Sequence, residues 1–305
     1  MAKESPETSG VSARRSIGMA LGLIGGLLAG FFVLQAVLAI QDHARAREIQ
    51  VADRIAKNIV QSITDLGVVR GFTMTYLARP AATDGADVAE LERRYRSGRA
   101  LLDEVAGDLA SFRPELRVRI AATIERATSA WERARRELAL ARDARDVAFS
   151  QGWFAAYSAI IGELEALLVE SRSPDRLNDP RFAFLSDLRI AILRWRLLRT
   201  REMGTVGATV AAGTPGSAAM VADIDMLRAR ADTLFAQIGL LVGSVTRPAL
   251  DLALRRVEDA LVPLNQAYER TRTAWRDGQL APIAPPEHDR LTLAAIDSIN
   301  RLIAS

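Results

Sequence analysis

The chain has 305 residues, of which 49% are hydrophobic and 25% charged, a composition typical of a folded protein rather than a disordered tail. Its 40 basic and 37 acidic residues are interspersed, and the lack of a long basic block argues against nucleic acid as a partner. The chain has no cysteine and only two histidines, which excludes disulfides, thiolate catalysis and the usual transition-metal sites.

The first predicted element is a transmembrane helix over residues 17–40, after a short cytoplasmic arm over residues 1–16. The stretch carries no charged residue and is long enough to cross the ~30 Å hydrocarbon layer of a membrane. A cleaved signal peptide is the alternative, although its apolar core would be about twice the usual length. Basic residues flank both ends, and the Arg14–Arg15 pair favours an N-terminus inside. We therefore expect a single-pass protein of a bacterial inner membrane, with most of the chain periplasmic.

Beyond residue 44 the pattern is almost entirely helical, and no convincing strand appears. Proline- and glycine-containing segments predict the breaks between helices, at residues 80–85, 113–114, 150–152, 171–180, 213–217, 247–248 and 280–286. The longest later apolar run, residues 234–245, is too short to cross a membrane. No second span is therefore predicted.

Three short segments recur in the same order along the chain. They pair "VRGFTMTYLA" at 69–78 with "MGTVGATVA" at 203–211, "RPEL" at 113–116 with "RPAL" at 247–250, and "ERATSAW" at 125–131 with "ERTRTAW" at 269–275. The order predicts an internal duplication: an all-α fold with two tandem four-helix bundles, over residues 45–172 and 181–305. The matching Trp131 and Trp275 are interpreted as packing residues where helix ends meet.

An arginine lies in the middle of an apolar helical face in each copy. In the first copy, the positions that share a face are Ala52, Ala56, Ile59, Ile63, Leu66, Arg70, Met74 and Leu77. In the second copy, they are Leu185, Leu188, Ile192, Trp195, Arg199, Met203, Val206 and Val210. Burying an unpartnered guanidinium costs several kcal/mol, so each arginine should meet an anion.

Two sources of that anion remain open. Arginines from two helices can clamp one small oxyanion, because their planar, forked donors suit it. Alternatively, each arginine pairs with an internal carboxylate, such as Asp65, Glu202 or Asp103, or extends to the bundle edge. Thr73 and Tyr76 lie within a turn of Arg70; each could donate to a bound oxyanion, or serve a surface or capping role.

The segments "VVRGFTMTYLA", "LERRYRSGRALLDEVAGDL", "FAAYSAIIGELEALL" and "LLRTREMGTVGATVA" resemble the nitrate- and nitrite-sensing (NIT) domain family over roughly residues 50–305. That resemblance implies an all-helical double bundle that binds nitrate or nitrite through arginines of two helices. It also implies attachment to kinases, chemoreceptors, cyclic-nucleotide enzymes or antiterminators. Arg70 before Gly71 matches the family's arginine–glycine motif.

The second copy departs from that motif, because Met203 precedes Gly204. The nearby arginines are Arg199 and Arg201. Periodicity favours Arg199, since Arg201 points about 160° away from the apolar stripe at about 100° per residue. The departure leaves open whether the ligand is nitrate.

No catalytic motif, cofactor motif or metal-ligand cluster is recognisable, so an enzyme is not expected. We expect a membrane-anchored sensor that binds nitrate or nitrite between arginine-bearing helices, pulls those helices together, and acts through a second copy or a signalling partner. The alternatives are a ligand-free helical module that docks another membrane protein, and a receptor for another anion such as a carboxylic acid.

Overall fold

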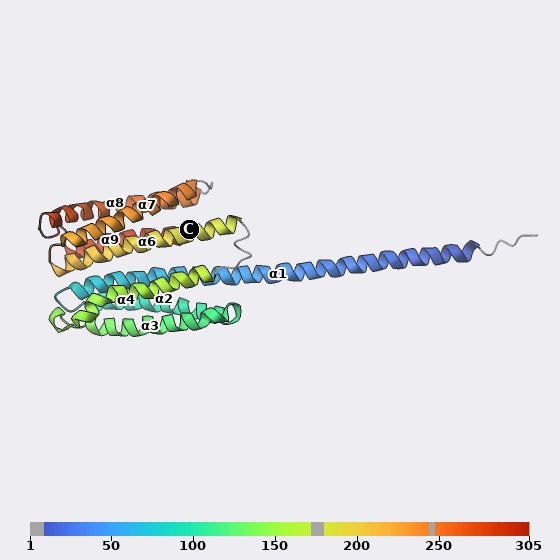
Figure 1. Cartoon of the computed structure of the whole chain (residues 1–305), viewed down its shortest axis with the longest axis horizontal. Helices are drawn as coiled ribbons and strands as arrows, with labels where there is room; N and C mark the ends of the chain where they lie inside the picture. The colour runs from blue at the N-terminus through green and yellow to red at the C-terminus, as the bar shows by residue number, and fades with distance from the viewer. Residues whose placement is uncertain (1–8, 172–179, 244–247, 305) are drawn as a thin grey trace, which may run out of the picture. The chain divides into compact units, whose positions relative to one another are not determined.

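The computed structural model describes the backbone of residues 9–171, 180–243 and 248–304. Side chains are described from residue 31 onward, except at 42, 44, 45, 180–182 and 304. Every regular element in these ranges is helical, which confirms the all-α prediction (Figure 1). The elements are α1 (Ser9–Ala78), α2 (Gly85–Phe112), α3 (Pro114–Leu138), the 3₁₀ turn η1 (Arg142–Ala144), α4 (Val147–Glu170), α6 (Pro180–Ala212), α7 (Ala218–Gly243), α8 (Pro248–Arg276) and α9 (Pro285–Ala304).

The chain divides into two compact units, Met1–Gln50 and Val51–Ser305. In the first unit, the described part of α1 exposes a run of large apolar side chains, namely Phe31, Phe32, Val33, Leu34, Val37, Leu38 and Ile40. Most of the predicted span at 17–40 lies outside the residues whose side chains are described, as do residues 1–8 of the predicted arm. The N-terminal anchor therefore stays a prediction.

In the second unit, residues 51–78 of α1 and helices α2, α3 and α4 form a first helix group. Helix α2 packs on α3, and α3 packs on α4. The Arg54 guanidinium of α1 pairs with Asp108 of α2 at 2.6 Å. On the other side of α1, Trp153 Nε1 of α4 donates to the carbonyl of Arg70 at 3.0 Å. These contacts fix α1 between α2 and α4.

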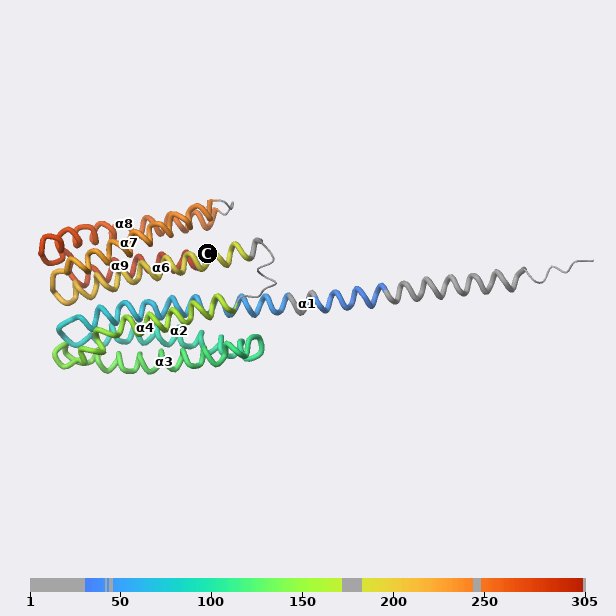
Figure 2. Tube along the Cα trace, viewed as in Figure 1, coloured from blue at the N-terminus to red at the C-terminus, as the bar shows by residue number. Residues whose placement is uncertain are grey.

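Helices α6, α7, α8 and α9 form a second helix group. Each packs on the next, and α9 returns to α6, so the four helices close around a shared interior. The tube in Figure 2 traces both groups. Most of the predicted linker at residues 171–180 lies outside the described residues. The order of elements agrees with two successive helical repeats, whereas their origin by duplication stays a prediction.

The helix ends follow from capping residues. The Asp84 carboxylate accepts from the backbone N–H of Ala86 at 2.7 Å and starts α2. Helix α3 begins directly at Pro114, as expected for a residue that lacks an N–H. The Asp146 carboxylate accepts from the N–H of Phe149 at 3.0 Å and starts α4. The break predicted at residues 150–152 is therefore wrong, because the chain turns earlier, around η1.

Within the described residues, α4 is the helix long and apolar enough to cross a membrane, with a mean hydropathy of 1.3. The sequence analysis predicted no such segment after residue 40. Trp153, Tyr157 and Leu164 on one face of α4 are buried in the first helix group. A core helix passes the same length and hydropathy test, so α4 by itself gives little support for a membrane span.

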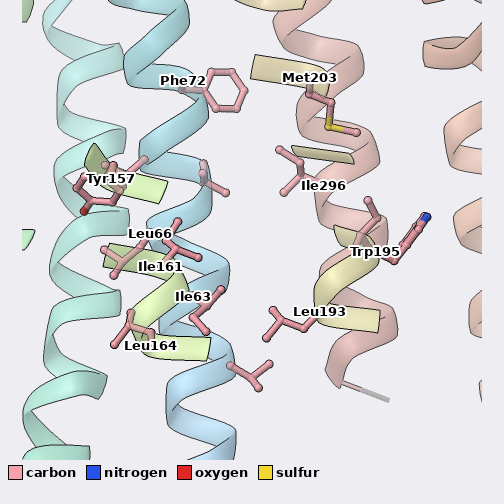
Figure 3. Close-up of a cluster of buried hydrophobic side chains, with 14 of the residues drawn as sticks. Ile63, Leu66, Phe72, Tyr157, Ile161, Leu164, Leu193, Trp195, Met203 and Ile296 are labelled. Atoms are coloured by element: carbon pink, nitrogen blue, oxygen red, sulfur yellow. The ribbon is translucent and has the colours of Figure 1, made fainter. Parts of the chain in front are cut away.

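One apolar core runs through both helix groups. Figure 3 shows Ile63 and Leu66 of α1 facing side chains of α4, and Leu193 of α6 on the other side of α1. Trp131 and Trp275 are 2% and 3% exposed, so the prediction that both pack in the interior is confirmed. Because this interior is mainly apolar, the arginines buried in it need an explanation.

Candidate functional site

Helices α1 and α6 lie side by side and run in the same direction. Arg196 of α6 donates through Nη2 to the carbonyl of Thr64 in α1 at 2.6 Å. Further along both helices, a Cβ built on Gly204 would lie 3.5 Å from the Cα of Gly71. The two helices are therefore parallel, and their backbones lie close together where both have a glycine.

Five of the described arginines are buried: Arg70, Arg145, Arg196, Arg199 and Arg272. What each guanidinium contacts decides whether it is a structural residue or a candidate for ligand binding. A buried cation is expected to have both hydrogen bonds and a counter-charge.

Arg70 is 4% exposed and has hydrogen bonds only to hydroxyl groups. Its Nη1 donates to Ser158 of α4 and its Nη2 to Thr200 of α6, both at 3.1 Å. The ring of Phe154 lies 4.5 Å from the guanidinium carbon. Nε has no hydrogen-bond partner, and no carboxylate in the described ranges pairs with Arg70. This arginine is the least compensated of the five.

The electrostatic surroundings of Arg70 disfavour its charge. Burial is the main cause, and the positive charges of Arg196 and Arg201 add to it, so that the pKa falls from 12.5 to about 9. At neutral pH the guanidinium is still charged. The fold therefore holds a destabilised cation that a bound anion would stabilise.

Arg199, the second predicted clamp residue, is paired internally. Its Nη1 forms a short salt bridge with Glu202, and its Nη2 donates to Asn265 of α8 at 2.7 Å. Glu202 is fully buried and also forms a salt bridge with Arg228 of α7 at 3.1 Å. Burial lowers the pKa of Arg199, and Glu202 opposes that shift. The alternative of an internal carboxylate thus describes Arg199, whose contacts lie inside the second helix group and are not shared with Arg70.

The arginine that faces α1 is instead Arg196, which is not among the residues of the predicted apolar face. It is fully buried, and its Nε donates to Asn300 at 3.1 Å. Its Nη1 has no partner among the described residues and lies 3.0 Å from where a Cβ on Gly67 would be. Burial lowers its pKa to about 10, although Asp65 partly offsets this. Residues 192, 196, 199 and 203 recur at steps of four, three and four, and that signal would have found it.

The three remaining predicted residues differ in position. Arg201 is exposed on α6. Thr73 is fully buried one turn after Arg70, and its hydroxyl has no hydrogen-bond partner among the described residues. Tyr76 is buried, with the Arg79 guanidinium 4.1 Å from its ring centre. Thr73 therefore has a free donor near Arg70, whereas Tyr76 belongs to the contacts around Arg79.

The other two buried arginines have structural roles. Arg145 donates to six backbone carbonyls, those of Tyr76, Leu77, Arg79, Ala81, Glu137 and Leu140. It thereby satisfies the carbonyl-rich ends of α1 and α3. Arg272 pairs with Asp225 of α7 at 2.7 Å. Neither has a donor directed toward Arg70.

A small cavity lies at the junction of α1, α6 and α9. It is lined by Gly67, Val68, Gly71, Phe72, Thr75, Thr200, Met203, Gly204, His288, Thr292 and Ile296. Thr200 belongs both to this lining and to the Arg70 contacts. The cavity volume is about 10 Å³, room for roughly one water molecule.

No protein-family model, curated protein or solved structure matches the chain at a significant level. The structure thus defines an all-helical protein with an uncompensated buried arginine beside a helix crossing. Membership of the NIT family stays an expectation from the sequence.

Proposed function

We propose that the chain is a membrane-anchored, extracytoplasmic sensor module that binds a small oxyanion, nitrate or nitrite, at Arg70. The observation that carries this proposal is the buried Arg70 guanidinium, whose described hydrogen bonds reach only Ser158 and Thr200. A permanent cation in that position costs several kcal/mol, and an anionic ligand would offset the cost. No internal carboxylate described in the structure does so.

In the proposed site, Arg70 supplies the main forked donor and Arg196 a second positive charge. The unused Nε of Arg70 and Nη1 of Arg196, together with the Thr73 hydroxyl, provide further donors. Nitrate presents three oxygens in a plane, which suits donors that converge from two helices. Arg196 takes the role predicted for Arg199 from the sequence.

The membrane anchor belongs to the same proposal. The apolar side chains exposed between Phe31 and Ile40 have the character of a lipid-facing helix. Arg70 lies on the same helix, α1, so a ligand-dependent shift would pass along α1 to the membrane or to a partner. The partner would be a second copy or a separate signalling protein.

Isothermal titration of the full chain in detergent tests the proposal, with nitrate, nitrite and chloride as ligands. We expect saturable heat with nitrate or nitrite for the wild type and little or none for Arg70→Ala. Arg255→Ala is the control, because Arg255 is an exposed arginine of α8 paired with Asp251. Equal heats from wild type and Arg70→Ala would remove Arg70 from the site.

The alternative function is a ligand-free scaffold module. The internally paired Arg199 and Glu202 favour it, because they show that this fold also buries arginines without a ligand. A scaffold predicts no anion-dependent rise in melting temperature. A specific ligand at 100 times its dissociation constant would add about 2.7 kcal/mol to the free energy of unfolding.

A further inference from the structure

Resting on the proposed function, we propose that the anion parts α1 from α6 at the Gly71–Gly204 contact. The described conformation is then the closed one. This direction is opposite to the expectation that the ligand pulls the two helices together. The argument rests on the space, the backbone contact and the hydrogen bonds at the crossing.

The cavity that shares Thr200 with the Arg70 contacts is too small for the ligand. The cavity between α1, α6 and α9 has a volume of about 10 Å³. That is about the minimum that holds a single water. Nitrate has four heavy atoms and nitrite three, so either would have to move the cavity walls. Those walls include Gly71 of α1 and Gly204 of α6.

The two backbones are already close at this point. A Cβ on Gly204 would already be in van der Waals contact with the Cα of Gly71, at 3.5 Å, and with the Phe154 ring, also at 3.5 Å. Only about a methyl group would fit between the two backbones here, which is less room than nitrite or nitrate needs. Room for a ligand therefore comes from separation of the helices.

Two of the hydrogen bonds between α1 and α6 use guanidinium groups of the proposed site. Arg70 of α1 donates to Thr200 of α6, and Arg196 of α6 donates to the carbonyl of Thr64 in α1. An oxyanion bound between the arginines would take up N–H groups that now make these bonds. Ligand binding and closure thus compete for the same donors, which links occupancy to the helix separation.

A disulfide across the crossing tests this inference. The chain has no cysteine, so the double variant Gly71→Cys/Gly204→Cys in the full chain places one pair of thiols at the contact. Because a Cβ on Gly204 would lie 3.5 Å from the Cα of Gly71, the two Cα atoms are well within the ~7 Å that a disulfide can bridge. We expect the reduced variant to bind nitrate and the oxidised variant to bind at least about tenfold more weakly. The two single-cysteine variants, treated with the same oxidant, control for oxidation itself.

The outcomes separate the inference from the proposed function. Equal nitrate affinity in the oxidised and reduced double variant would overturn helix parting and leave the Arg70 site standing. Absence of nitrate and nitrite binding to the wild type would overturn the proposed function. Weaker binding after oxidation in the double variant alone would support both.

A distance measurement covers the case in which the double variant does not fold. Val118 of α3 and Leu240 of α7 are 73% and 78% exposed, so spin labels on Val118→Cys/Leu240→Cys should leave the core intact. We expect nitrate to lengthen the distance between the labels in an otherwise unchanged chain. An unchanged or shorter distance at saturating nitrate would contradict helix parting.

Discussion

Arg70 and Arg196 reach across the contact between α1 and α6 in opposite directions, each to an oxygen on the other helix. Arg70 Nη2 lies 3.1 Å from the Thr200 hydroxyl, and Arg196 Nη2 lies 2.6 Å from the carbonyl of Thr64. Both helices therefore contribute a buried positive charge to the contact between them. Repulsion between them lowers the pKa of Arg70 beyond the effect of burial alone.

The first prediction concerns Arg196→Met, which removes the second charge but keeps an unbranched apolar side chain. We expect nitrate affinity to fall roughly tenfold, because at an effective dielectric of about 20 a charge ~10 Å from the ligand contributes on the order of 1–2 kcal/mol. Titration calorimetry measures the change. Arg199→Met is the matched control on the same helix. If it weakened nitrate binding as much as Arg196→Met does, Arg199 would belong to the ligand site.

The second prediction concerns pH. The charged form of Arg70 binds the anion, and its folded pKa of about 9 is depressed from 12.5. Nitrate affinity should therefore be level from pH 7 to about 9 and then decrease by up to about tenfold per pH unit. Without ligand, the cost of burying the cation is fully present below pH 9 and is relieved as pH rises above it. Affinity that stays constant to pH 10.5 would contradict the assignment of Arg70 as the binding cation.

The third prediction concerns the buried pair in the second helix group. Glu202→Gln would leave Arg199 and Arg228 without their shared carboxylate. We expect a loss of about 3–5 kcal/mol in the free energy of unfolding, because a buried charge is left uncompensated. Asp251→Asn, which breaks the exposed pair with Arg255, should cost less than about 1 kcal/mol. Denaturant unfolding distinguishes the two, and similar losses would show that the Glu202 network is not a buried one.

The fourth prediction concerns Arg145, whose six carbonyl acceptors join the ends of α1 and α3. Arg145→Met keeps much of the volume but leaves these carbonyls without their donor, so we expect a loss of roughly 2–4 kcal/mol. Arg142→Met, one turn earlier in η1 and exposed, should change stability by less than about 0.5 kcal/mol. Thermal unfolding measures both variants. Equal melting temperatures for Arg145→Met and Arg142→Met would mean that water can hydrogen-bond those carbonyls in place of Arg145.

Helix periodicity and chain breakers were sufficient to predict the helical class and most helix ends. The spacing of Ile59, Ile63 and Leu66 placed Arg70 on the buried face of α1, and the structure buries it at 4% exposure. The start of α4 was missed because Ser150 and Gly152 were interpreted as a loop. The capping carboxylate of Asp146 comes four residues before Ser150, and an exposed glycine is tolerated inside the helix.

The partners of the arginines could not be predicted from spacing. Helical spacing gives the face on which Arg199 lies, but the position of Asn265 relative to it depends on how α6 and α8 pack. Glu202 was named as a possible partner from sequence because it is three residues away, a pairing that is local to one helix. The predicted apolar face of the second copy contains Trp195 and therefore leaves out its neighbour Arg196. The buried face of α6 is wide enough to include both residues.

The most direct test of the central claim is the melting temperature of full-length Arg70→Met, compared with wild type, with and without saturating nitrate. Met203 occupies the corresponding position of the predicted second copy, so methionine is a side chain that this packing accepts. We predict that without nitrate the variant is at least as stable as wild type, because a buried uncompensated cation is gone, and that nitrate stabilises only the wild type. A variant that is less stable than wild type without nitrate, and that gains the same stability from nitrate, would contradict the account.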